Sequence, residues 1–191
     1  AKTDGLGAAA GFTGPRGMAM DRLRNLLYVL DSDSYGSTSY ARRIDPATGR
    51  VETVAGGAFG YADGQGTAAG FNSPRGAALD PTGSVLYVAE TARVRSLVLA
   101  SSTAFTVAVV DTNLSDNLGG LAMAPDGKEL YAARLALSGG GACQIVRVTL
   151  ASSQTATVAG GFSWAGVADR ILMLYGDLVP ACAGKLVSSA T

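Results

Sequence analysis

Histidine is absent from this 191-residue sequence, and cysteine occurs only twice. The sequence therefore lacks the commonest general base and the commonest nitrogen ligand of zinc. Charged residues are scarce at 16%, and 15 Lys and Arg are balanced by 15 Asp and Glu. This balance leaves no net charge to attract nucleic acid or an anionic membrane surface. No apolar run approaches the roughly 20 residues that span a bilayer, so we expect no direct membrane insertion.

What the sequence does contain is a long internal repeat. The stretch DGLGAAAGFTGPRGMAMD, which begins at Asp4, is matched in register by DGQGTAAGFNSPRGAALD, which begins at Asp63. Corresponding residues are 59 positions apart, as in the pairs Asp4 and Asp63, Phe12 and Phe71, Pro15 and Pro74, and Tyr28 and Tyr87. A fixed period of this size indicates stacked copies of one supersecondary unit.

Each unit reads as four short antiparallel strands joined by Gly-, Pro- and Asp-containing turns. We expect strands at residues 17–21, 26–30, 42–45 and 50–55, then at 75–80, 85–89, 93–99 and 105–110, then at 119–123, 129–133, 144–150 and 155–159. The polar segment 31–39 is predicted to be a loop. Units of four strands at a spacing of about 40–60 residues are the signature of a β-propeller.

The predicted domain organisation follows from these units. Residues 1–161 would form propeller blades at about 4–57, 63–110 and 116–161, and residues 162–191 would be the start of a further blade or an irregular tail. The fold class is therefore all-β, with about three to four blades present. Closed propellers need 4–8 blades, so we expect an incomplete ring and a fragment of a longer chain.

The second unit carries the residues of a known family. DG-x-G-x-x-A-x-F-N-x-P-x-G from Asp63, then LYVA at 86–89, then Glu90 and R-x-R at 93–95, resembles the NHL-repeat β-propellers. The resemblance covers about residues 4–161 and weakens in the third unit. The Asp-Gly-x-Gly linker resembles the large secreted or cell-surface members more than the basic RNA-binding members. The resemblance implies about six blades in a closed ring.

Two glycine motifs, at 5–10 and 64–69, fit the dinucleotide pattern G-x-G-x-x-A. A nucleotide site needs a helix that starts after these glycines and aims its amides at the pyrophosphate. Here a proline and a strand follow instead, and the motif recurs once per repeat. We interpret both motifs as linkers and expect no bound cofactor.

Arg16 and Arg75 each precede an innermost strand, where they could face the central channel. One interpretation is an anion-binding rim. The other, which we favour from sequence, is pairing with a linker carboxylate such as Asp4 or Asp63, because an arginine fork suits a carboxylate.

Asp31 and Asp33 are weak candidates for a metal site, because two carboxylates and neighbouring hydroxyls are hard oxygen ligands suited to calcium. The loop lacks the further acidic residues of a dedicated calcium loop, so a solvated surface loop is the favoured interpretation.

Two features indicate an oxidising compartment. Asn113 begins the glycosylation tripeptide Asn-Leu-Ser in a polar connection between units. Cys143 and Cys182 are candidates for a disulfide that would fix the tail to a blade, and two unpaired thiols are the alternative. We accordingly predict an extracellular or cell-surface location.

The sequence as a whole favours a non-catalytic propeller module for protein–protein interaction or for structural assembly of a large surface glycoprotein. Its partners would be other protein modules or copies of the same assembly. One alternative is a calcium-dependent propeller lyase or hydrolase, for which Asp4, Asp21 and Asp80 are the candidate carboxylates. A further alternative is an RNA-binding propeller, which would need a basic groove with stacking aromatics.

Overall fold

The computed structural model describes residues 2–33, 38–58, 60–110, 117–135 and 143–160. The elements in chain order are β1 (Gly5–Leu6), the 3₁₀ turn η1 (Gly7–Ala9), β2 (Pro15–Asp21), β3 (Leu26–Ser32), β4 (Ser39–Asp45), β5 (Arg50–Gly56), β6 (Gly64–Gln65), the 3₁₀ turn η2 (Gly66–Ala68), β7 (Gly76–Leu79), β8 (Val85–Ala89), β9 (Arg93–Val98), β10 (Thr103–Val109), β11 (Asn117–Met123), β12 (Glu129–Leu135), β13 (Gln144–Thr149) and β14 (Gln154–Ala159).

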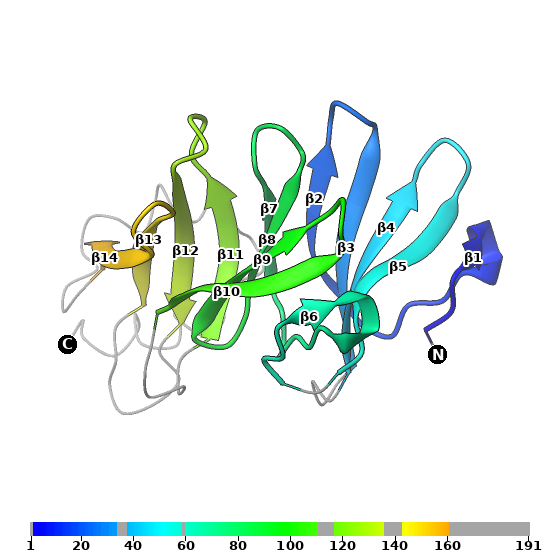
Figure 1. Ribbon diagram of the computed structural model, residues 1–191, viewed down its shortest axis with the longest axis horizontal. Coiled ribbons are helices and arrows are strands. Elements are labelled where there is room, and N and C mark those ends of the chain that lie inside the picture. The colour runs from blue at the N-terminus through cyan, green and yellow to red at the C-terminus, as the bar shows by residue number, and fades with distance from the viewer. Residues whose placement is uncertain (1, 34–37, 59, 111–116, 136–142, 161–191) are drawn as a thin grey trace, which may run out of the picture.

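The strands form three antiparallel sheets that follow one another along the chain. Their strand orders are β1-β5-β4-β3-β2, β6-β10-β9-β8-β7 and β11-β12-β13-β14. In Figure 1 the sheets fan out from the inner strands β2, β7 and β11 and make an open arc. The prediction of an all-β propeller built from antiparallel blades is confirmed. No helix among these residues is long and apolar enough to cross a bilayer.

The first two sheets each have a fifth strand that the sequence did not indicate. β1 pairs with β5 through Gly5 and Val51, and β6 pairs with β10 through Gln65 and Thr103. An outer edge strand presents unpaired N–H and C=O groups to solvent. The linker that precedes each blade covers part of that edge, because it lies along the outer strand of its own sheet.

The apolar core lies between the sheets. One cluster of buried side chains joins the first sheet to the second and includes Tyr28, Leu30, Phe71 and Val88. A separate cluster joins the second sheet to the third and includes Leu118 and Leu130. The long apolar runs of the sequence therefore form strands that are covered on both faces, as expected for stacked blades.

Glycines let the inner strands meet backbone to backbone. A Cβ added to Gly17 would lie 2.4 Å from the carbonyl oxygen of Arg75, and one added to Gly76 would lie 2.2 Å from that of Gly119. Real Cβ atoms do not approach backbone oxygens this closely, so any side chain at these positions would push the strands apart. The register of β2 against β3 shifts at the same place, between Pro15 and Met18.

The segment that we predicted to be a loop, residues 31–39, is partly strand. β3 continues through Ser32 and β4 begins at Ser39. The two serine hydroxyls lie 3.0 Å apart and are buried. Buried polar groups need partners, and these two hydroxyls supply each other, which explains why a polar stretch extends a buried hairpin.

Candidate anion-binding site

Arg42 ties the first linker to its blade. Its side chain is fully buried and donates from Nη2 to the carbonyl oxygen of Thr3 at 2.8 Å and to Asp4 at 2.9 Å. Its Nη1 donates to the carbonyl oxygen of Gly11 at 3.1 Å and to Asp31 at 3.2 Å. A buried guanidinium needs such partners to offset its desolvation, so Arg42 serves the fold.

Arg95 does the same for the second linker. It is fully buried and donates to the carbonyl oxygens of Ala62 and Gly70, each at 3.0 Å, and to Asp63 at 2.7 Å. The linker carboxylates Asp4 and Asp63 are therefore bound by Arg42 and Arg95. Our sequence-based expectation that they pair with Arg16 and Arg75 is wrong, because the arginines of the third strand of each blade reach them instead.

Arg16 and Arg75 have no anionic partner among the residues that the structure describes. No hydrogen bond or ion pair joins either guanidinium to any residue of the described chain, and Arg75 Nε is buried with no acceptor. The Nε atoms of Arg42 and Arg95 also lack acceptors, but their other guanidinium nitrogens donate. We call Arg16 and Arg75 the axial arginine pair.

The close contact of the inner strands places the axial arginine pair together. Gly17, which follows Arg16, lies against the carbonyl oxygen of Arg75. The two arginines therefore lie at the N-terminal ends of neighbouring inner strands, Arg16 in β2 and Arg75 immediately before β7. Arg16 is exposed and Arg75 is half-buried. Burial lowers the pKa of Arg75, and the like charge of Arg16 lowers it further.

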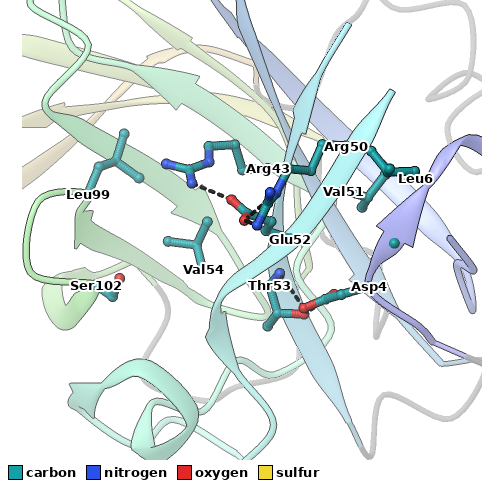
Figure 2. Close-up of a pocket in the computed structure, with 11 residues that line it drawn as sticks. Asp4, Leu6, Arg43, Arg50, Val51, Glu52, Thr53, Val54, Leu99 and Ser102 are labelled. Atoms are coloured by element: carbon teal, nitrogen blue, oxygen red, sulfur yellow. Dashed lines mark hydrogen bonds and ion pairs between the residues drawn. The ribbon is translucent and has the colours of Figure 1, made fainter. Parts of the chain in front are cut away.

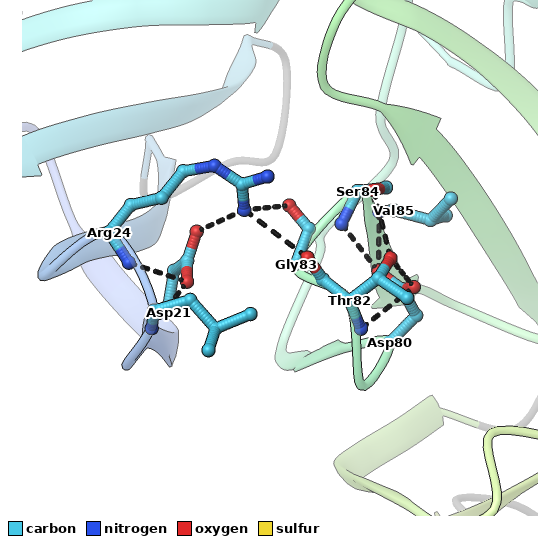
Figure 3. Close-up of polar contacts among 8 residues, drawn as sticks. Asp21, Arg24, Asp80, Thr82, Gly83, Ser84 and Val85 are labelled. Carbon is cyan, nitrogen blue, oxygen red and sulfur yellow. Dashed lines mark hydrogen bonds and ion pairs between the residues drawn. The ribbon is translucent and has the colours of Figure 1, made fainter.

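Two of the carboxylates proposed for a calcium-dependent enzyme are occupied by hydrogen bonds within turns. Asp21 accepts hydrogen bonds from the backbone N–H groups of Leu23 and Arg24, and it pairs with the Arg24 guanidinium at 2.9 Å (Figure 3). Asp80 caps the equivalent turn by accepting the backbone N–H groups of Thr82, Ser84 and Val85. Both therefore cap turns between β-strands.

Arg24 adds a contact between the first and second blades. Its Nη1 also donates to the carbonyl oxygens of Thr82 and Gly83, at 3.2 and 3.1 Å (Figure 3). Burial raises the pKa of Asp21, but its hydrogen bonds with Arg24 and Leu23 and the charge of Arg24 outweigh burial and lower it overall. Within the described ranges, no three Cys, Asp or Glu side chains are grouped in a way that could hold a metal ion.

Asp31 and Asp33, the two weak candidates for a metal site, make different contacts. Asp31 is fully buried, and its oxygens accept the backbone N–H groups of Thr13 and Gly14 and the Arg42 guanidinium. Asp33 accepts the backbone N–H and the hydroxyl of Thr38. Asp31 thus holds the linker in place, at the position that Glu90 occupies in the second blade.

Two candidate modification sites lie wholly or partly beyond the described residues. Asn113 and Cys182 are outside them. Cys143 takes part in a disulfide bond, and its pairing with Cys182 stays a prediction, as does glycosylation of Asn113.

An open groove of about 610 Å³ lies between the outer strand β5 and the β9–β10 turn. Figure 2 shows Glu52 at its centre, paired with Arg43 and Arg50, while Asp4 is bonded to Thr53. Leu99 and Ser102 line it from the second sheet. Its charged side chains are matched with one another, so this groove carries no unsatisfied charge, in contrast to the axial arginine pair.

The structural roles of Arg42 and Arg95 were not predicted, although the sequence contains a pattern that indicates them. Each lies on the third strand of its blade, after an acidic residue, Asp31 or Glu90, that ends or follows the second strand. These acidic residues are 59 positions apart, like the rest of the repeat. A buried acid at the end of the second strand and an arginine on the third strand, which recur in both repeats, indicate a structural pair.

No family model matches this sequence. NHL repeat-containing protein 2 of Bos taurus is 35% identical over 116 residues, which cover 60% of this chain and 15% of the relative. Protein SUPPRESSOR OF QUENCHING 1, chloroplastic, of Arabidopsis thaliana is 34% identical over 90 residues, which cover 45% of this chain and 8% of the relative. The chain thus spans a small part of the curated relatives that it matches.

Solved structures share the fold. The crystal structure of a nidogen/laminin complex matches with a TM-score of 0.58 and 16% identity, over 76% of this chain and 48% of that chain. Regucalcin of Agrobacterium tumefaciens, a calcium-binding protein, matches with a TM-score of 0.53 and 12% identity, over 78% of this chain and 44% of that chain. The described chain therefore has a β-propeller fold. Together with the relatives, the repeat supports an NHL-repeat propeller.

Proposed function

We propose that this NHL-repeat propeller is a non-catalytic module that binds other proteins outside the cell. The observation that carries the proposal is the axial arginine pair, two cations on adjacent inner strands with no anionic partner in the described chain. Such a pair is suited to binding an anionic group, because guanidinium groups form strong charge-assisted hydrogen bonds with carboxylates. It offers neither a nucleophile nor a base for catalysis.

The contacts of the acidic residues support a binding role over the calcium-dependent enzyme. Asp4, Asp21 and Asp80 each accept several hydrogen bonds from polypeptide groups. A metal ion at any of them would have to replace contacts that close a turn or hold a linker. The likeness to regucalcin shows the fold and carries no inference about calcium.

The extracellular location is supported by the disulfide at Cys143 and by the glycosylation tripeptide at Asn113. Disulfides persist in oxidising compartments and are rare in the cytosol. The name of the Arabidopsis relative refers to the chloroplast, so sequence similarity alone does not assign this chain to the cell exterior.

The test is to isolate the natural protein and to measure its mass before and after deglycosylation, followed by cross-linking of the native complex. We expect a mass that falls on deglycosylation and a stable cross-linked species that contains a second polypeptide. An unglycosylated protein that stays monomeric would contradict the proposal. Ester or lactone turnover with stoichiometric calcium would favour the enzyme, and salt-sensitive retention of RNA would favour the nucleic-acid alternative.

A further inference from the structure

We infer that the axial arginine pair, Arg16 with Arg75, binds the carboxylates of an acidic segment of a partner protein. The inference rests on the proposed function, since it names the chemistry of the partner. Its physical basis is that two guanidinium groups with no anionic partner among the described residues come from adjacent inner strands whose backbones touch, so a ligand with two or more carboxylates could engage both.

The first step of the argument concerns position. Arg16 and Arg75 occupy the same place in successive repeats, immediately before a glycine whose missing side chain lets β2 and β7 touch. On the third inner strand, β11, Gly119 takes the corresponding place, because its carbonyl oxygen meets Gly76 as that of Arg75 meets Gly17. The axial arginine pair is thus bordered, on the third inner strand, by a position without a side chain.

The second step concerns charge. Every other arginine of the first two blades that is buried or half-buried has a partner: Arg42 and Arg95 bind carboxylates, Arg43 binds Glu52, and Arg93 lies over the ring of Tyr61. Arg75 is half-buried and feels only burial and the like charge of Arg16. Within the described residues the fold leaves this repulsion uncompensated, so a bound anion would be the missing partner.

The third step concerns the kind of anion. A nucleic acid would need a broad basic surface with stacking aromatics, whereas this chain has no net charge and the other arginines named above are already occupied. Two guanidinium groups on adjacent strands suit a short acidic peptide segment, in which neighbouring Glu or Asp side chains reach one guanidinium each. A free inorganic anion shares this chemistry and is distinguished by experiment.

The experiment titrates the natural protein with a tetraglutamate peptide, a tetraglutamine peptide and inorganic phosphate at low ionic strength. We expect tetraglutamate to bind, tetraglutamine not to bind, and added salt to weaken the complex because the charges are exposed. Arg16→Gln and Arg75→Gln should each weaken tetraglutamate binding about tenfold or more. Arg75→Lys should weaken it less, because charge remains while the planar fork is lost.

Arg22→Gln is the matched control. Arg22 is exposed at the opposite end of β2 and likewise has no ion pair within the described residues, so its replacement removes the same charge elsewhere. Equal loss of binding in Arg22→Gln, or no difference between the wild type and the axial variants, would overturn the inference. Phosphate that binds at least as tightly as tetraglutamate, and depends on Arg75, would overturn the assignment to a peptide and indicate a free anion.

Stability provides a second readout that does not depend on the probe. Removal of a half-buried, uncompensated charge should raise the melting temperature of Arg75→Gln above that of the wild type. Tetraglutamate should raise the melting temperature of the wild type and leave that of Arg75→Gln unchanged. A lower melting temperature for Arg75→Gln would show that Arg75 serves the fold and would overturn the inference. These outcomes are independent of secretion and of whether a complex is isolated, so failure here is distinguishable from failure of the proposed function.

Discussion

The two linkers, residues 4–14 and 63–73, have nearly the same sequence but different surroundings. The second lies between the first and second sheets, where Phe71 and Ala69 are fully buried in the core cluster with Tyr28. The first packs against Arg42 of its own sheet, and the corresponding Phe12 is only half-buried in the described chain. The phenylalanine is therefore covered by the preceding blade, and its burial is a property of the neighbour.

The hydrogen bonds that a buried arginine donates to the linker, by contrast, are the same in both repeats. Arg42 donates to the carbonyl oxygens of Thr3 and Gly11, and Arg95 donates to those of Ala62 and Gly70, residues that correspond in the repeat. Each arginine also binds the aspartate that opens its linker. The comparison teaches that each repeat folds its linker onto its own blade, and that the neighbouring blade then adds apolar burial.

The two blades differ at one buried acidic residue, which is Asp31 in the first and Glu90 in the second. Asp31 of the first blade accepts two backbone N–H groups, at 2.8 and 2.7 Å, and the Arg42 guanidinium. Glu90 of the second blade accepts one backbone N–H, that of Asn72 at 3.4 Å, and lies 3.8 Å from Arg95. Glu90 is buried, and its Oε1 has no hydrogen-bond partner among the described residues. Burial raises the pKa of Glu90 to about 8, against the opposing charge of Arg95.

The largest expected effect is a difference in the free energy of unfolding between alanine variants of the two linker phenylalanines. Phe71→Ala should lower the free energy of unfolding by about 3–5 kcal/mol, because it leaves a cavity between two sheets. Phe12→Ala should lower it by less than half as much, since the Phe12 ring is half-exposed before the change. Urea unfolding followed by fluorescence or circular dichroism measures both variants. Equal losses would contradict the view that the preceding blade buries Phe71.

The next prediction concerns the two acids. Asp31→Ala should lower the free energy of unfolding by about 3 kcal/mol, because it removes a partner of buried Arg42 and leaves two amides without an acceptor. Glu90→Ala should cost less, because Glu90 makes one long hydrogen bond and its own buried charge is unfavourable. The same urea experiment compares them. An equal or larger loss in Glu90→Ala would contradict the view that Asp31 is the better-paired of the two acids.

The pH dependence of the unfolding free energy tests the buried position of Glu90 directly. Because the pKa of Glu90 is about 8 in the folded protein and ordinarily 4.5, the folded state keeps a proton that the unfolded state releases. The contribution of Glu90 is therefore fully present below pH 4.5 and is lost as the pH rises toward 8 and above. We expect wild-type stability to fall over this range and the fall to be smaller in Glu90→Gln.

The control for this experiment is Glu129→Gln, at a partly exposed glutamate of the third sheet. It should retain the wild-type slope of unfolding free energy against pH. If Glu90→Gln and Glu129→Gln give the same slope, Glu90 ionises in the folded protein as an ordinary glutamate does.

The smallest expected effect concerns the turns. Arg24 links Asp21 to the second blade, whereas the corresponding position of the second blade is Gly83 and provides no such link to the third. Arg24→Ala should lower the free energy of unfolding only slightly, because the Arg24 side chain is 51% exposed and exposed ion pairs contribute little. A loss as large as that of Asp31→Ala would show that the inter-blade turn contact is central to the fold.

The repeat allowed most of the fold to be predicted from the sequence. The spacing of Tyr28 and Tyr87 gave the blades, and the apolar runs gave the strands that both clusters bury. The partners of the arginines could not be predicted, because Arg42 reaches Asp4 across a folded linker, a distance that spacing does not encode. The anion-binding interpretation of Arg16 and Arg75, an alternative from the sequence, became the favoured one only when Asp4 and Asp63 were found bound to Arg42 and Arg95.

The edge strands β1 and β6 have a consequence for how such a chain grows by duplication. Each of the first two repeats brings its own strand to cover its own outer edge, so a copy of such a repeat would carry its edge protection with it. Such a copy would also bring the phenylalanine that packs against its predecessor, as Phe71 does. A single duplication event thus adds a blade together with its edge protection and its half of the new interface, which makes the number of blades an easy property for evolution to change.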